Sequence, residues 1–107
     1  MDLALIGNGS YQAVIDSRAR LRWLCWPRFD SSPVFGHLLD EERGGCFDVR
    51  PQGGSFKATQ RYLRETAILE TSFESRHSSF TITDVAPRFV RRRGEDLHRP
   101  RELLRIL

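Results

Sequence analysis

The sequence predicts a mainly-β fold, an antiparallel β-sandwich with one short helix, from the pattern of its apolar residues. Short apolar or alternating runs recur along the whole chain and are separated by turn residues. The runs Ile68–Glu74 and Phe80–Val85, joined by the turn Arg76–Ser79, form the clearest hairpin pattern. Only one segment, after Asp30, carries apolar residues at helical spacing. A length of 107 residues allows one domain, which we expect to span residues 1–107.

The N-terminal part of the chain is expected to form three strands. Leu3–Ile6 ends at Gly7–Ser10, where glycine and asparagine tolerate positive φ, and Tyr11–Ile15 follows, so the chain opens with a hairpin. Asp16–Arg20 is the next turn. Leu21–Trp26 then has apolar side chains on both faces, which predicts a central strand that is covered on both sides.

One short helix is expected directly after the stretch Trp23–Asp30. Ser32 can cap this helix, with Pro33 at its first helical position. Four apolar residues then recur at helical spacing: Val34, Phe35, Leu38 and Leu39. Gly44 and Gly45 end the unit, so the predicted helix is about two turns long.

The remainder of the chain again has the pattern of strands. Cys46–Val49 and Phe56–Tyr62 precede the hairpin described above. The charged stretch Arg88–Asp96 is interpreted as a loop, and Arg101–Leu107 as the beginning of another strand. Because an apolar edge strand needs a partner, we expect the sandwich to be incomplete at this end and the chain to self-associate.

The distribution of charge argues against nucleic-acid binding by the folded body. Apolar residues make up 39% and charged residues 29% of the chain, which is ordinary for a globular protein. From Arg88 onward there are seven arginines and three acids, whereas the first 87 residues hold ten basic and eleven acidic side chains. Since nucleic-acid binders usually carry a basic face on the folded body, we expect no nucleic-acid partner.

Several further classes of protein are also disfavoured. No apolar run approaches the ~20 residues that span a bilayer, and Met1–Gly7 lacks the basic region of a signal peptide. We therefore expect a cytoplasmic protein without a membrane partner. Cys25 and Cys46 match no metal-binding spacing, so reduced thiols are the expected state and no metal site is predicted. The sequence has no glycine-rich phosphate loop with its lysine, and no cofactor is expected.

A series of short segments, in order along nearly the whole chain, carries a resemblance to a known family. They are Leu5–Gly9, Trp23–Cys25, Pro27–Ser31, Phe35 with Leu38–Leu39, Ala58–Tyr62, Leu69–Thr71, Thr83–Pro87 and His98–Arg105. In this order they resemble the N-terminal region of bacterial proteins of glycoside hydrolase family 15, the glucoamylase-like and trehalase-like enzymes. Trp26 departs from the family's pattern, which more often has an aliphatic residue there.

The resemblance implies a β-sandwich that precedes an (α/α)-barrel catalytic domain. In that family, two glutamates of the barrel act as general acid and general base, and α-glucosidic bonds are hydrolysed by inversion without a cofactor. The barrel region is not in this sequence, so we expect no catalytic residue in the chain and no activity of the chain alone. The resemblance also implies that the β-sandwich packs on the catalytic domain and completes the rim of the sugar site. An α-glucoside or oligosaccharide would bind through the catalytic domain.

Arg28, Phe29 and Asp30 are the candidate substrate-binding residues. A planar donor and an acceptor beside an aromatic face are common in sugar sites. The alternative interpretation is local, with Asp30 paired to Arg28 to hold the loop rigid. Most of the fourteen acids lie in predicted turns or on strand faces, where solvated charge is the ordinary interpretation.

Two other functions remain open from the sequence. The first is a free-standing carbohydrate-binding or protein-interaction β-domain, in which Trp23 and Trp26 would form an exposed platform. Their place in a strand that is apolar on both faces favours a core position instead, with Cys25 as a small buried hydrophobe. The second is a small basic β-domain that binds nucleic acid through Arg88–Arg105.

Overall fold

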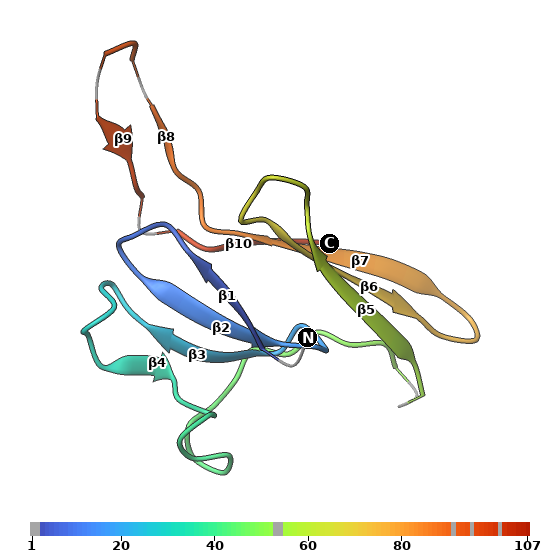
Figure 1. Ribbon diagram of the computed structural model, residues 1–107. Coiled ribbons are helices and arrows are strands. Elements are labelled where there is room, and N and C mark those ends of the chain that lie inside the picture. Colours follow the sequence, from blue (N-terminus) through green and yellow to red (C-terminus); the bar gives the residue numbers. More distant parts are fainter. Residues whose placement is uncertain (1–2, 53–54, 91, 95, 101) are drawn as a thin grey trace.

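The computed structural model describes residues 3–52, 55–90, 92–94, 96–100 and 102–107, and it forms two antiparallel sheets packed as a sandwich (Figure 1). Sheet A has the strand order β1-β2-β3-β4 and sheet B the order β10-β7-β6-β5. The strands of sheet A are β1 (Leu3–Gly7), β2 (Gln12–Asp16), β3 (Leu21–Cys25) and β4 (Pro33–Phe35). Those of sheet B are β5 (Lys57–Tyr62), β6 (Leu69–Glu74), β7 (Ser79–Val85) and β10 (Leu104–Ile106). The predicted mainly-β sandwich is confirmed.

A separate two-stranded ribbon stands out from the sandwich (Figure 1). It consists of β8 (Phe89–Val90) and β9 (Leu97–His98), which pair antiparallel with Phe89 opposite His98. The two rings of that pair meet edge to face, with their centroids 5.1 Å apart. The prediction of a loop for 88–96 was therefore wrong at Phe89 and Val90. Their partners Leu97 and His98 lie after the charged residues, and the local sequence around Phe89 does not indicate this pairing.

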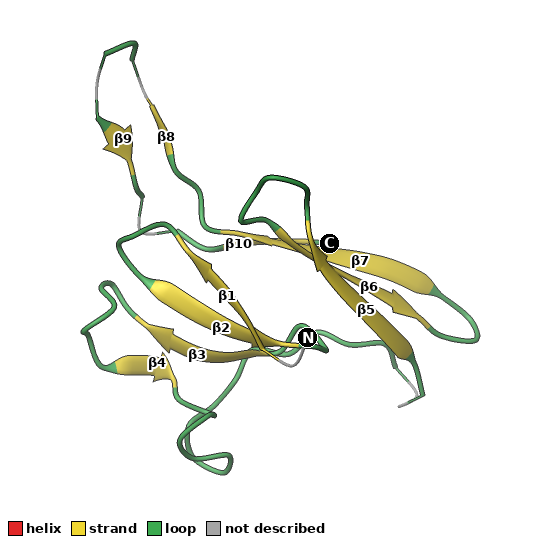
Figure 2. Ribbon diagram, in the orientation of Figure 1, coloured by secondary structure: helices red, strands yellow, loops and turns green. Residues whose placement is uncertain are grey.

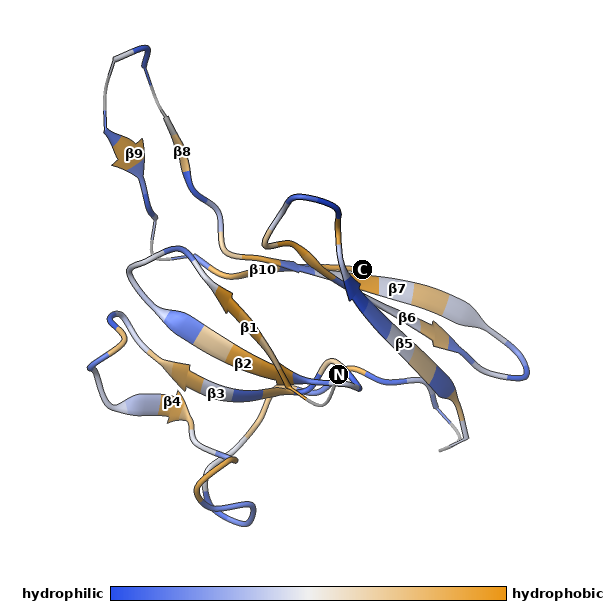
Figure 3. Cartoon of the chain, viewed as in Figure 1, coloured by the Kyte–Doolittle hydropathy of each residue, from blue (hydrophilic) through white to orange (hydrophobic). Residues whose placement is uncertain are grey.

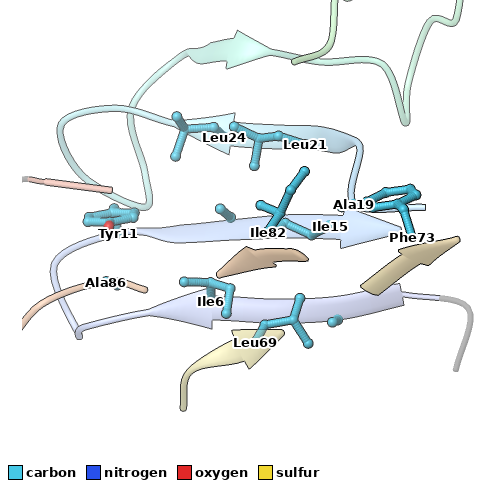
Figure 4. Packing of buried hydrophobic residues seen from close by; sticks show 12 residues of the cluster. Ile6, Tyr11, Ile15, Ala19, Leu21, Leu24, Leu69, Phe73, Ile82 and Ala86 are labelled. Carbon is cyan, nitrogen blue, oxygen red and sulfur yellow. The ribbon is translucent and has the colours of Figure 1, made fainter. Parts of the chain in front are cut away.

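The hydrophobic core lies between the two sheets. Alternate residues of β1 and β2 point inward, as the predicted hairpin requires, and Ile6 and Ile15 are almost completely buried. They meet Leu69, Phe73 and Ile82 of sheet B (Figure 4). Along most strands of the two sheets, hydrophobic residues are interspersed with hydrophilic ones (Figure 3). The pair β6–β7, with Phe73 opposite Phe80, confirms the second predicted hairpin.

Side chains of β5 close one side of the sandwich. The hydroxyl of Tyr62 donates to the carbonyl oxygen of Leu5 on β1 over 2.8 Å and accepts from the backbone N–H of the same residue over 3.0 Å. Gln60 Nε2 donates to the carbonyl of Asp16, 2.8 Å away. Side chains of β5 in sheet B are thus hydrogen-bonded to the backbone of β1 and β2 in sheet A.

The opposite side is held by a buried ion pair between β10 and β7. Arg105 Nε donates to Asp84 Oδ1 over 2.6 Å, and its Nη2 donates to Oδ2 over 3.2 Å. The same guanidinium donates to the carbonyls of Phe47 and Ala19. Asp84 is fully buried, and this burial raises the pKa of its carboxyl against the opposing effect of the Arg105 hydrogen bonds. The predicted strand near the C-terminal end is confirmed as β10.

The predicted short helix is wrong. The described residues contain no helix (Figure 2), and Pro33–Phe35 forms β4 instead, with Phe35 opposite Leu24 and Pro33 opposite Cys25. Two turns of helix are only marginally stable in isolation, whereas a strand at this place gains pairing with β3. The chain then turns through the hydrogen bond from Gly36 N–H to the carbonyl of Gly44, 2.8 Å.

Two of the other strand predictions need adjustment. The predicted strand 46–49 is reduced to one bridge, in which Phe47 and Leu21 exchange backbone hydrogen bonds of 3.0 and 2.8 Å. The central position of β3, between β2 and β4, is confirmed. Its burial does not alternate strictly, because Leu24 and Cys25 are both buried where the register with β4 shifts.

Candidate functional site

The candidate site is the 27–31 loop between β3 and β4, at the end of the sandwich where the β1–β2 turn lies. The backbone N–H of Phe29 donates to the carbonyl of Ser10 over 3.2 Å, which holds the loop against that turn. Within the loop, Ser31 N–H donates to the carbonyl of Arg28 over 3.1 Å, and Arg28 N–H donates to Ser31 Oγ over 3.2 Å. The loop is therefore a compact turn, fixed at its base.

The three predicted site residues lie together and face solvent. Arg28 Nη2 donates to Asp30 Oδ2 over 3.0 Å, and the two side chains are 63% and 54% exposed. Phe29 is 66% exposed between them. The local ion pair that we considered from the sequence is present. Contact of these residues with a sugar stays a prediction.

Neither tryptophan is fully exposed, but only Trp26 belongs with the core, and the core interpretation is not borne out for Trp23. Trp26 packs against the hydrophobic core, and its ring meets that of Tyr11 with the centroids 4.9 Å apart. Trp23 is half-buried on β3. Cys25 is 5% exposed and is a free thiol, as expected for a small buried hydrophobe. The position of Trp26 agrees with the core interpretation.

Asn8 is a structural residue of this end that sequence reasoning missed. It is 2% exposed, and its Nδ2 donates to the carbonyls of Pro87 (3.0 Å) and Pro100 (2.7 Å), on the two segments that lead into the ribbon. Its Oδ1 accepts from Ser10 N–H over 3.0 Å. The sequence marked Asn8 only as a turn former. No local signal indicated that its amide would bridge two distant carbonyls.

Arg99 is a second residue that the sequence did not single out. Gly9 has a φ of +94°, and a Cβ atom there would lie 3.4 Å from the side chain of Arg99. The arginine therefore lies across the turn. Next to the same turn, Tyr11 donates its hydroxyl proton to the carbonyl of Glu102, and burial, followed by the charge of Glu102, raises the pKa of Tyr11 to about 12.

The buried carboxylates among the described residues have structural partners. Asp84 is bound by Arg105, as described above. Asp16 accepts two backbone N–H bonds of 3.0 Å and one bond of 2.7 Å from Arg20 Nε. Glycoside hydrolysis needs one carboxylic acid that is free to give a proton and a second carboxylate across the scissile bond. Neither buried carboxylate is placed for that chemistry.

Metal-binding and membrane-spanning features are equally absent from the part of the chain that the structure describes. That part holds no group of three or more histidine, cysteine or acidic side chains that could bind a metal ion. Nor does it hold a helix long and apolar enough to cross a membrane. His37 lies half-buried in a turn, where its Nδ1 accepts a hydrogen bond from Arg22 Nε over 2.9 Å.

The fold defines an all-β domain of two sheets with an exposed, charged aromatic loop at one end. The profile of the family described as trehalase-like, N-terminal, matches residues 2–100. The chain belongs to this trehalase-like N-terminal domain family, which confirms the resemblance recognised from the sequence.

The curated relatives that match are trehalases, and the chain corresponds to a small part of each. It is 42% identical over 85 residues to Trehalase 1 of Sulfolobus acidocaldarius, a match that covers 79% of this chain and 15% of the relative. It is 39% identical over 82 residues to the trehalase of Mycolicibacterium smegmatis, covering 76% of this chain and 12% of the relative. No solved structure gives a significant match.

Proposed function

We propose that this chain is the non-catalytic N-terminal β-sandwich of a trehalase of the glycoside hydrolase family 15 type. The observation that carries the proposal is the family match over residues 2–100, together with relatives that are named trehalases. The structural bonds of Asp16 and Asp84 support a non-catalytic role. In this proposal the sandwich packs on the catalytic barrel, and hydrolysis of the α-glucosidic bond takes place in that barrel.

The 27–31 loop is proposed to reach the rim of the sugar site. Phe29 offers an exposed apolar face, and the Arg28–Asp30 pair offers planar donors and an acceptor beside it. Bonds to Ser10 and within the loop hold these groups in place before a ligand arrives, which lowers the entropy lost on binding.

Assays of the pure chain test the non-catalytic role. Glucose release from trehalose and from maltooligosaccharides should equal that of a blank without protein. Any turnover that follows the chain through purification would contradict the proposal.

A graft into a relative tests the role of the loop. The matching segment of Trehalase 1 of Sulfolobus acidocaldarius would be replaced by this chain, and KM and kcat for trehalose measured. Phe29→Ala should raise KM, because the exposed ring contacts the sugar in this proposal. Phe89→Ala is the matched control, since Phe89 is also an exposed aromatic residue, 49% accessible, but lies on the ribbon. Equal KM values for the two variants would argue against a sugar contact at Phe29.

A carbohydrate-binding domain that acts alone is the second candidate, favoured by the exposure of Phe29. It predicts that the isolated chain binds trehalose or a linear glucan, with amide shifts confined to the 27–31 loop in a nuclear magnetic resonance titration. The first proposal predicts no such shifts without the catalytic domain.

A further inference from the structure

A small cavity with a basic lining, the basic cavity, lies at the end of β3 opposite the candidate loop. The turn between β2 and β3 contributes Arg18 and Arg20, and the segment between β4 and β5 contributes Asp48, Arg50 and Phe56. The cavity has a volume of about 120 Å³. Pockets for drug-sized molecules measure ~300–1,000 Å³, so this one fits a ligand of only a few heavy atoms.

The two arginines of the turn are attached to a backbone that is fixed from several sides. Ala19, which lies between them, has a φ of +59°, a left-handed conformation that is uncommon for alanine. Asp16 Oδ1 accepts from the backbone N–H groups of Arg18 and Arg20 over 3.0 Å each. The carbonyl of Ala19 accepts from the guanidinium of Arg105. The turn is thus ordered before a ligand arrives, which lowers the entropy lost on binding.

Both arginines of the turn keep hydrogen-bond donors for a ligand. The Arg18 guanidinium lies over the ring of Phe56, 5.3 Å from its centroid, which leaves the N–H groups at the edge of the guanidinium open. Arg20 donates its Nε to Asp16 Oδ2 over 2.7 Å, and its Nη groups have no hydrogen-bond partner among the described residues. The basic cavity therefore suits a ligand that accepts hydrogen bonds.

The charges around the basic cavity do not balance. Three arginines line it, and the acids beside them are Asp48 in the lining and Asp16 of the turn, so one positive charge is left over. Arg50 and Asp48 form a loose pair, with 3.6 Å between Nε and Oδ2, beyond hydrogen-bond distance. The nearby Arg105–Asp84 pair is neutral in itself. A ligand with a single negative charge balances the basic cavity, whereas a second negative charge would be repelled by the two aspartates.

We propose that the basic cavity binds the carboxylate of a small organic acid with one negative charge. The planar fork of an arginine matches the two oxygens of a carboxylate, and such bidentate pairs are among the stronger hydrogen-bonded contacts. In this complex the carboxylate accepts from Arg18 and Arg20, while the short carbon chain of the acid lies against the open part of the Phe56 ring. That apolar wall favours an organic acid over an inorganic anion. No residue of the 27–31 loop takes part, so this site is independent of the proposed function.

Titration of the full 107-residue chain with sodium propionate tests this site, with amide shifts followed by nuclear magnetic resonance at neutral pH and constant ionic strength. Saturable shifts should appear in the 16–20 turn and at Asp48, Arg50 and Phe56. Propionamide has the same shape without the charge and should cause no such shifts. Inorganic phosphate should bind more weakly than propionate, because it has no apolar part and carries more charge.

A variant of the turn gives the second readout. Arg18→Gln removes one of the two guanidinium forks and should raise the Kd for propionate by about tenfold or more. Arg18 is exposed, so amide shifts of the variant outside the turn should match those of the unmodified chain. Arg76→Gln is the matched control, since Arg76 is an exposed arginine of the turn between β6 and β7, and its Kd should not change.

A chain that shows no saturable shifts with propionate would overturn the proposal. Equal binding of propionamide would overturn it too, because the negative charge would then contribute nothing. The same holds for a Kd of Arg18→Gln equal to that of Arg76→Gln. Tighter binding of phosphate than of propionate would contradict a carboxylate as the ligand and would assign the basic cavity to an inorganic anion.

Discussion

Replacing Arg105 with methionine removes the guanidinium that neutralises a fully buried carboxylate. Asp84 is 0% exposed, and Arg105 supplies both of its charged hydrogen bonds as well as those to the carbonyls of Phe47 and Ala19. Breaking a buried pair from one side typically costs about 3–5 kcal/mol. A domain of this size has a stability of about 5–15 kcal/mol, so the loss should be obvious.

The assay is urea unfolding of each variant at one low protein concentration, so that association does not contribute to the measured free energy. Arg61→Met is the control. Arg61 pairs with Glu70, but its side chain is 72% exposed, so this pair should contribute at most about 1 kcal/mol to the free energy of unfolding. The double variant Asp84→Leu with Arg105→Met removes both charges and should recover the part of the loss that comes from the unpaired carboxylate, while the carbonyls of Phe47 and Ala19 still lack their donor.

The loss in Arg105→Met should also depend on pH in a defined direction. Burial raises the pKa of Asp84 above its ordinary value, and without the arginine nothing opposes this effect. A raised pKa in the folded state favours folding at low pH, and that benefit is lost as pH rises through the folded pKa. The variant should therefore be least destabilised in acid. A cost of Arg105→Met no greater than that of Arg61→Met would refute the reasoning.

Further predictions concern Tyr11, Asn8 and two phenylalanines. Burial raises the pKa of Tyr11 from 10.0 to about 12, so the stability should fall as pH rises from 10 to 12, and Tyr11→Phe should abolish this alkaline loss. Asn8→Ala leaves two prolyl carbonyls without a donor and should cost about 1–3 kcal/mol in urea unfolding; Asn8→Asp, which cannot donate, should not recover it. Phe73→Ala should cost about 3–5 kcal/mol, whereas Phe29→Ala should stay within about 0.5 kcal/mol.

The hairpins could be predicted from the sequence because their causes are local. The Gly-Asn-Gly turn lies directly between two strands, and the alternation of β6 and β7 continues on both sides of a polar turn. The helix after Ser32 was wrong for the opposite reason. The apolar residues after Ser32 do recur at helical spacing. However, the free energy gained when Pro33–Phe35 pairs with β3 depends on another strand, and the local sequence pattern does not contain that information.

The candidate site was partly predictable. The cluster of Arg28, Phe29 and Asp30 followed from its unusual composition and lies exposed as one unit. Asn8 and Arg99 belong to the same end only because the fold brings residues about ninety positions apart together. Contacts of that range leave no periodic trace in a single sequence, so these two residues became visible only in three dimensions.

The amide of Asn8 makes the ribbon and the candidate loop mechanically dependent on each other. It holds the two segments at the foot of the ribbon, and through Ser10 it is two hydrogen bonds away from the backbone of Phe29. Spreading the foot of the ribbon would break both bonds from Asn8 or would move the turn on which the loop rests. A displacement of the ribbon would therefore be transmitted to the backbone of Phe29 through these hydrogen bonds.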